Sequence, residues 1–219
     1  MENHCMEKVT KIVIGNVCFI VDKKNNKVLL LKRNREPMQA MYTGVGGKTL
    51  PEESPFDSCI REAKEETGLD VSEVNLRGVV KTILDGGDSL WILSVYTAAG
   101  FSGKMIECNE GELEWVDINA INSYGLIGFI RKIMPYILDE NVIFDGVIIH
   151  DIKGNVIKDS IKTYSRSFDE HQNKKGGHYT ASHAAEKNNL HRRIPRKIPR
   201  PEARSRNQIL APRKETEFD

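Results

Sequence analysis

The stretch GGKTLPEESPFDSCIREAKEETGL, residues 46–69, decides how this chain folds and where its chemistry lies. Ser54 followed by Pro55 is a typical helix start, because a serine side chain caps free N–H groups and proline suits the first helical position. Gly68 is typical of the residue after a helix end, since glycine adopts the left-handed conformation easily. The pattern predicts a helix over residues 55–67.

This predicted helix has two neighbouring stripes of side chains. At about 100° per residue, each stripe gathers residues three or four positions apart. The acidic stripe contains Glu62, Glu65 and Glu66, and the apolar stripe contains Phe56, Cys59, Ile60 and Ala63. We expect the apolar stripe to face a core and the acidic one to face something polar.

A solvated face is the ordinary interpretation of a charge run, but two costs count against it here. Like charges four residues apart destabilise a helix by roughly 0.2–0.5 kcal/mol per pair. Carboxylates near the C-terminal end also oppose the helix dipole, by roughly 0.3–1 kcal/mol each. A divalent cation would reverse both effects, and Mg²⁺ usually binds one or two carboxylates together with water and substrate phosphates. The residues therefore indicate metal-assisted attack on a phosphate chain.

The chain around this helix predicts a mixed α/β or α+β domain. Residues 11–22 and 27–33 are apolar runs joined by the polar turn KKNN, which is typical of a hairpin. A periodic helix is expected over residues 127–138, with a kink or an early end at Pro135. Further strands are expected in residues 42–48, 76–83, 90–98 and 114–116, and a last hairpin in residues 142–151 and 155–164.

The composition divides the chain of 219 residues into a domain, residues 1–165, and a basic tail, residues 166–219. Residues 171–219 alone carry 12 Lys and Arg against 5 Asp and Glu. We expect a disordered, solvated tail, with contact to nucleic acid or an acidic partner as one alternative and no functional part in the domain as the other.

The remaining composition excludes several classes of protein. The four cysteines at positions 5, 18, 59 and 108 lack CxxC spacing, so neither a zinc knuckle nor a redox motif is indicated. No apolar run approaches the roughly 20 residues that cross a bilayer. The start MENHCMEKVTK lacks the order of a secretory signal. We therefore expect a cytoplasmic protein that does not span a membrane.

Residues 47–69 match a known motif throughout. Gly47, Glu53 and the run from Arg61 to Leu69 reproduce the Nudix box GX5EX7REUXEEXGU, with Ala63 at a hydrophobic position. The chain thus resembles the Nudix hydrolases, most of all MutT-type 8-oxo-dGTP diphosphatases, over about residues 8–150. The resemblance implies an α/β/α sandwich with a mixed sheet, in which water attacks one phosphorus of a nucleoside triphosphate and releases the monophosphate and pyrophosphate.

The resemblance also implies individual roles in the box. Arg61 would orient Glu62, while Glu53 and Gly47 would support the site from behind. Glu110 resembles a downstream acid that some family members use as a ligand or base, so Glu62 is the expected base and Glu110 the alternative. The implied ligands of Mg²⁺ or Mn²⁺ are Glu62, Glu65, Glu66, the Gly46 carbonyl and Glu110.

Contacts to the rest of the substrate are open to two interpretations each. Arg33 and Lys48 lie beside the expected phosphate path, but either is equally well an ordinary surface cation. Tyr42 and Trp115 are candidates for packing against a base, although a tryptophan after a strand is more often part of the core.

The base edge is expected to be read from two segments. Thr43 occupies a position where some relatives carry a base-contacting asparagine. Purine-selective relatives often place a carboxylate or amide after the strand that contains Trp115, and Asn119 is the amide expected there. No acid lies between Asp117 and Asp139.

The expected function is Mg²⁺-dependent hydrolysis of a nucleoside triphosphate such as 8-oxo-dGTP or a related oxidised purine nucleotide. One alternative is hydrolysis of another nucleoside diphosphate derivative, such as a nucleotide sugar or a dinucleoside polyphosphate. Another is a nucleotide-sensing module whose tail contacts nucleic acid. The intact acidic box disfavours the sensor, which has no need of all the catalytic acids.

Overall fold

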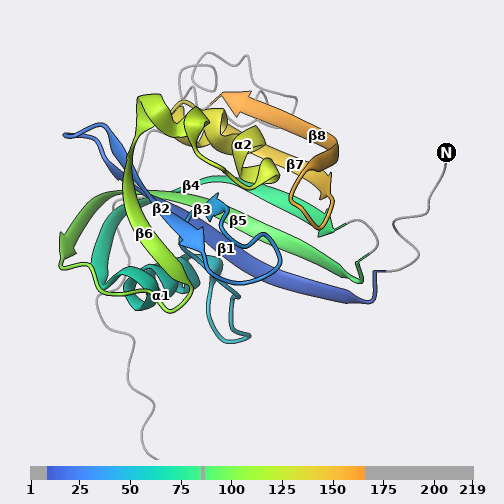
Figure 1. The fold of residues 1–219 in the computed structure, drawn as a ribbon, viewed down its shortest axis with the longest axis horizontal. Coiled ribbons are helices and arrows are strands. Elements are labelled where there is room, and N and C mark those ends of the chain that lie inside the picture. The colour runs from blue at the N-terminus through green and yellow to red at the C-terminus, as the bar shows by residue number, and fades with distance from the viewer. Residues whose placement is uncertain (1–8, 85–86, 166–219) are drawn as a thin grey trace, which may run out of the picture. The chain divides into compact units, whose positions relative to one another are not determined.

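The computed structural model describes residues 9–84 and 87–165. Predictions made for residues 166–219 lie outside this part. Eight strands form one mixed sheet with the order β3-β2-β1-β5-β4-β7-β8, and β6 pairs with β2 (Figure 1). The elements are β1 (Lys11–Asp22), β2 (Lys27–Arg33), β3 (Tyr42–Thr43), α1 (Pro55–Thr67), β4 (Leu69–Leu84), β5 (Ser89–Gly103), β6 (Gly111–Asp117), the 3₁₀ helix η2 (Ile118–Ser123), α2 (Gly128–Leu138), β7 (Val142–His150) and β8 (Val156–Ser165).

The sheet is built around β1 and β5, which pair in parallel from Lys11 opposite Ser89 to Ile20 opposite Ala98. On one side, β5 pairs antiparallel with β4, which pairs in parallel with β7. On the other side, the end of β1 forms the expected antiparallel hairpin with β2. The final hairpin of β7 and β8 is also present.

The two helices cover opposite faces of this sheet, as Figure 1 shows with α2 above and α1 below. Successive side chains of β1 point to opposite faces of the sheet, so they contribute in turn to two separate cores. Val17 and Phe19 pack in the cluster that contains the buried residues of α2. Cys18 and Ile20 pack in the cluster that contains Cys59 and Ala63 of α1. The predicted α/β/α sandwich with a mixed sheet is confirmed.

Some local expectations were wrong in detail. Phe56 was expected in the core, but it lies in the first turn of α1, is 44% exposed and has an edge-to-face contact with the Tyr96 ring. Of the kink or early end expected at Pro135, the early end does not occur, because α2 continues to Leu138 with its apolar face still buried beyond the proline. Within the part of the chain that the structure describes, no helix is long and apolar enough to cross a membrane.

Candidate functional site

Helix α1 is fixed at both ends, which holds its acidic stripe in place. The Ser54 hydroxyl accepts a hydrogen bond from the Asp57 N–H at 3.1 Å. At the other end, Gly68 has φ 75° and its N–H donates to the Lys64 carbonyl, so the predicted bounds of the helix are confirmed. These caps set which side chains of the last two turns face the neighbouring loop.

The glycine-rich segment that precedes α1 lies antiparallel to β1. The Asn16 N–H donates to the Gly47 carbonyl at 2.9 Å, and the Cys18 N–H donates to the Val45 carbonyl at 2.7 Å. A Cβ atom on Gly47 would lie 2.5 Å from a carboxylate oxygen of Glu62. Glycine at this position therefore lets the helix carboxylate lie directly against the loop.

Arg61 connects the acids of this region. Its guanidinium donates to both carboxylate oxygens of Glu53, at 2.6 and 3.0 Å, and also to Glu62 at 2.9 Å and Glu65 at 3.0 Å. The same group donates to the Lys48 carbonyl at 3.2 Å. The paired hydrogen bonds from Arg61 lower the pKa of Glu53 to about 2. Arg61 thus ties the loop to the acidic stripe, as a bidentate guanidinium does well.

Glu66 is the most buried acid of the stripe, at 7% exposure. Its carboxylate accepts a hydrogen bond from the Gly46 N–H at 2.9 Å. Burial raises the pKa of Glu66 to about 8, and the negative charges of Glu110 and Glu62 act in the same direction. Burial also raises the pKa of Glu62, with Glu65 and Glu110 adding to the effect. The negative charges of Glu62, Glu65, Glu66 and Glu110 therefore act on the same small region of the site.

This donor set suits a hard divalent cation, since carboxylate and carbonyl oxygens are the ligands that Mg²⁺ and Mn²⁺ prefer. Across residues 9–84 and 87–165, however, no three acidic, histidine or cysteine side chains converge on one point. The reason is that Glu62 and Glu65 bond to Arg61, whereas Glu66 bonds to the Gly46 amide. The site's composition fits the metal, and the individual ligands stay a prediction.

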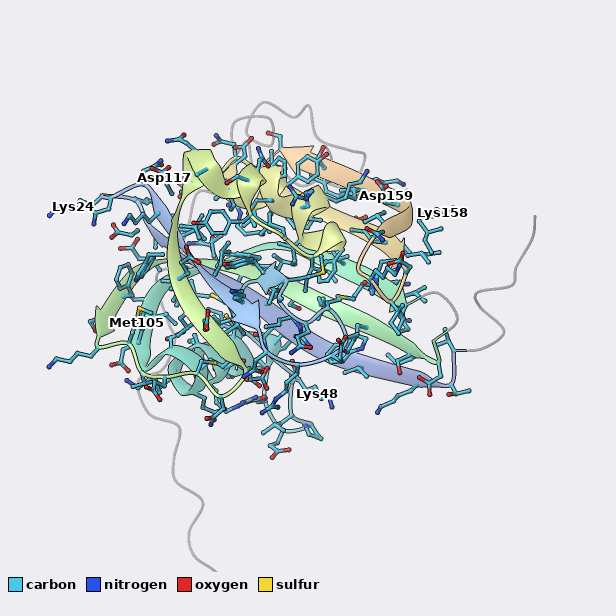
Figure 2. The ribbon with its side chains drawn as sticks, viewed as in Figure 1. Lys24, Lys48, Met105, Asp117, Lys158 and Asp159 are labelled. Carbon is cyan, nitrogen blue, oxygen red and sulfur yellow. The ribbon has the colours of Figure 1, made fainter. Side chains whose placement is uncertain are left out.

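An open cleft of about 580 Å³ is lined by Glu62 and Glu110, whereas Glu65 and Glu66 are not among its lining residues. Figure 2 shows Lys48 at the lower edge of the domain, in the loop between β3 and α1. Glu110 lies in the turn before β6 and is 3.8 Å from the Arg35 guanidinium. The structure brings seven of the predicted site residues to the lining of the cleft: Arg33, Thr43, Gly46, Gly47, Lys48, Glu62 and Glu110.

Two predicted base contacts do not line the cleft. The Tyr42 hydroxyl donates to Glu114 at 3.0 Å, so its ring is held against β6. The Asn119 N–H donates to the Asp117 carboxylate at 2.8 Å at the start of η2, and Figure 2 shows Asp117 at the upper left of the domain and Lys48 at its lower edge. Their role in substrate binding stays a prediction that the geometry does not favour. Trp115 packs with the core beside α1 and against Phe101, which supports the core interpretation.

The inner end of the cleft consists of residues that sequence reasoning missed. These residues include Met38, Thr82, Trp91, Ile127, Phe129 and His150. They come from β4, β5, β7, the start of α2 and a loop, so no local motif contains them. The only available signals were a polar Thr82 inside an apolar strand and a histidine that ends the apolar run of β7.

Comparisons with known proteins identify the sequence class. Residues 13–137 match the NUDIX domain family. An uncharacterized Nudix hydrolase, YvcI of Bacillus subtilis, is 33% identical over 122 residues, which are 54% of this chain and 70% of that protein. An oxidized purine nucleoside triphosphate hydrolase of Danio rerio is 30% identical over 95 residues, 43% of this chain and 61% of that protein. An ADP-ribose pyrophosphatase of Methanocaldococcus jannaschii is 39% identical over 57 residues, 26% of this chain and 34% of that protein.

Solved structures agree with this class. The MutT protein of Bacillus halodurans superimposes with a TM-score of 0.61 at 25% identity, over 68% of this chain and 97% of that one. The MutT protein of Methanosarcina mazei gives a TM-score of 0.51 at 25% identity, over 57% of this chain and 91% of that one.

Proposed function

The chain belongs to the Nudix hydrolase family, and on that premise we propose that it hydrolyses a nucleoside triphosphate to the monophosphate and pyrophosphate in a Mg²⁺-dependent reaction. The proposed substrate is 8-oxo-dGTP or a related oxidised purine nucleotide. The observation that carries the proposal is that Glu62 and Glu110 line the same cleft as the cations Arg33 and Lys48. Acids and cations on one cleft wall suit a phosphate chain and the water that attacks it.

Each side chain has a task in this proposal. Glu62, Glu65, Glu66 and the Gly46 carbonyl would hold the cation, which would supply Lewis-acid polarisation of a phosphoryl oxygen and a lowered pKa of water. Glu62 takes the proton from the attacking water, with Glu110 as the alternative base, because both carboxylates face the cleft.

The remaining groups position these acids and the phosphates. Arg61 keeps Glu62 oriented through the 2.9 Å contact between guanidinium and carboxylate. Arg33 and Lys48 neutralise phosphate charge from the cleft wall. Such groups contribute by holding the reacting atoms in place rather than by reacting themselves.

A second candidate is hydrolysis of a nucleoside diphosphate derivative. It is favoured by the relative named ADP-ribose pyrophosphatase, whose matched segment has the higher identity although it is short. The same acids would serve, since both substrates contain a diphosphate. The oxidised purine substrate is favoured by the Danio rerio relative, which matches over more of this chain.

The test is a panel of substrates with Mg²⁺ and identified products. We expect the highest kcat/KM for an oxidised purine triphosphate over its unoxidised parent, with pyrophosphate released. Equal rates for 8-oxo-dGTP and dGTP would refute the sanitising role, and preferred cleavage of ADP-ribose or a nucleotide sugar would favour the second candidate.

The panel includes a variant that tests the acids directly. Glu65→Gln should abolish pyrophosphate release while leaving the circular dichroism spectrum unchanged, because removing a ligand charge costs metal affinity rather than core packing. The matched control is Glu52→Gln, which changes an exposed acid just before the helix. Undiminished hydrolysis in Glu65→Gln would reject its assignment as a ligand.

A further inference from the structure

The inner end of the cleft holds two buried polar side chains that the proposed hydrolysis does not use. Thr82 and His150 are each 5% exposed, and both line the cleft. The Thr82 hydroxyl has no hydrogen-bond partner among residues 9–84 and 87–165. A buried hydroxyl without a partner costs roughly 1–3 kcal/mol, so a bound ligand that supplies the bond would gain from it.

The hydrogen bond made by Nδ1 of His150 determines whether its other ring nitrogen, Nε2, donates or accepts. Nδ1 lies 3.1 Å from the Asp151 carbonyl oxygen, which is only an acceptor, so Nδ1 carries the hydrogen in this contact. In the neutral ring, Nε2 is then a hydrogen-bond acceptor. The ring is stacked on Phe129, with centroids 6.0 Å apart and an interplanar angle of 26°. The ring is therefore held with an acceptor available.

The pairing of β4, β5 and β7 places Thr82, Trp91 and His150 on one face of the sheet, which is the floor of the cleft. Thr82 pairs with Trp91 of β5, and Leu84 pairs with His150 of β7. Thr82 and Leu84 are two positions apart on β4 and so point to the same face. Trp91 is therefore directly opposite Thr82, about 5 Å away, whereas His150 is the diagonal neighbour of Thr82 across the β4–β7 pair, at roughly 7–8 Å.

This chemistry suits a flat heteroaromatic ring. Trp91 and Phe129 offer aromatic surfaces, and the two buried polar groups offer an acceptor beside a hydroxyl that both donates and accepts. We propose that Thr82 and His150 form the base-recognition subsite of this cleft, reading a nucleobase edge that presents an N–H donor beside an acceptor. The inference rests on the proposed function in that the ligand is a nucleotide, and it moves base recognition from η2 to the floor of β4, β5 and β7.

The test measures binding separately from turnover, using the full chain. Guanosine and adenosine 5′-monophosphates are titrated calorimetrically into the wild type and into His150→Phe, which keeps a ring on Phe129 but removes Nε2. We expect the better-bound monophosphate to lose about 5- to 20-fold in affinity, the effect of one neutral hydrogen bond with its buried partner. His150→Gln, whose amide reaches the position of Nε2, should recover part of that loss.

Further variants control for unfolding and for changes in binding that are unrelated to the base contact. Thr82→Val is nearly isosteric and should also weaken binding, whereas Thr163→Val, the same substitution at an exposed position of β8, should not. In the substrate panel, His150→Phe should raise KM and leave kcat nearly unchanged, since His150 is proposed to contact the base and not the phosphates. Melting curves establish that each variant is folded.

The outcomes separate this inference from the proposed function. Unchanged affinity and KM in both His150→Phe and Thr82→Val would overturn the inference while hydrolysis stands. Affinity lost in Asn119→Ala instead would return base recognition to η2 and also overturn it. Weakened binding in the floor variants of a chain that hydrolyses no nucleotide would support the subsite and refute the proposed function. A wild type that binds neither monophosphate would overturn the subsite.

Discussion

At the scale of single residues, the site depends on close approach more than on unusual side chains. Gly47 was expected by resemblance to support the site, and the structure adds the reason, because the space beside it is filled by the carboxylate of Glu62. Arg61 was expected to orient Glu62, and the structure adds its contacts to Glu53, Glu65 and the Lys48 carbonyl. These further contacts follow from distances that a sequence does not contain.

We expect Gly47→Ala to lower kcat strongly with little loss of stability. The added methyl would lie 2.5 Å from Glu62 and displace its carboxylate, and a displacement of about 1 Å in an active site costs roughly 100-fold. The matched control is Gly125→Ala, because a Cβ atom there meets nothing within 4 Å. Steady-state kinetics and melting curves check the prediction, which equal kcat values in the two variants would contradict.

Glu66 makes the stability of the metal-free protein depend on pH. Its pKa is raised to about 8 from an ordinary 4.5, so folding favours the protonated acid. The stabilising effect is complete below pH 4.5 and is lost as pH rises towards 8. Glu66→Gln keeps an acceptor for the Gly46 N–H but cannot ionise. In EDTA, we expect its stability advantage over the wild type to grow between pH 5 and 8, as measured by urea unfolding. A gap that is constant with pH would show that Glu66 is not the titrating group.

At the scale of elements, α1 was the most predictable part of the molecule because its signals are local. Ser54, Pro55 and Gly68 set its ends within one sequence segment, and the structure has the same bounds. The strands were found by their apolar runs, but β4 and β5 are longer than predicted. Their extra residues, such as Val71 and Phe101, pair with each other beyond the apolar runs. A helix cap is determined by residues next to the helix end, but the extent of strand pairing depends on both strands together.

Ser54→Ala should destabilise the protein without changing its fold. The substitution removes the cap that accepts from the Asp57 N–H, at a cost of about 1 kcal/mol. For a domain of this size the melting temperature should fall by roughly 2–4 °C. Ser160→Ala, at an exposed position of β8, is the control and should melt like the wild type. A Ser54→Ala variant with unchanged melting would mean that the cap contributes nothing to stability.

At the scale of the whole molecule, the sequence predicted the layers and the acidic end of the cleft, but not its inner end. The acids lie in one motif of 23 residues and were visible at once. The inner end is made by side chains such as Thr82, Trp91, Phe129 and His150, which only the pairing of β4, β5 and β7 brings together. Of the residues predicted to read the base edge, Thr43 lines the cleft and Asn119 does not, and Tyr42, predicted to pack against the base, bonds to Glu114 instead.

A chain that ends at residue 165 should fold and hydrolyse substrate as the full chain does. Among the residues that the structure describes, both buried clusters and the whole lining of the cleft lie before that point. We expect equal kcat/KM and melting temperature for residues 1–165 and 1–219, compared under the same conditions. Loss of turnover on truncation would assign residues 166–219 a part in catalysis. Nucleic-acid binding that survives deletion of residues 171–219 would refute a role for the tail in such binding.

The parallel pairing of β1 with β5 also has a consequence for synthesis on the ribosome. Lys11 pairs with Ser89, so the pairing of β1 with β5 cannot begin until Ser89 has been synthesised. At about 5–20 residues per second, the intervening chain takes several seconds to emerge. During that time the apolar strand β1 has the β2 hairpin on one side and an open edge on the other, a state in which nascent chains aggregate. By then the β2 hairpin, the glycine segment that pairs with β1 through Gly47 and Val45, and α1, whose Cys59 packs in one cluster with Cys18, have all been synthesised, so the edge of β1 that pairs with β5 is the one left open.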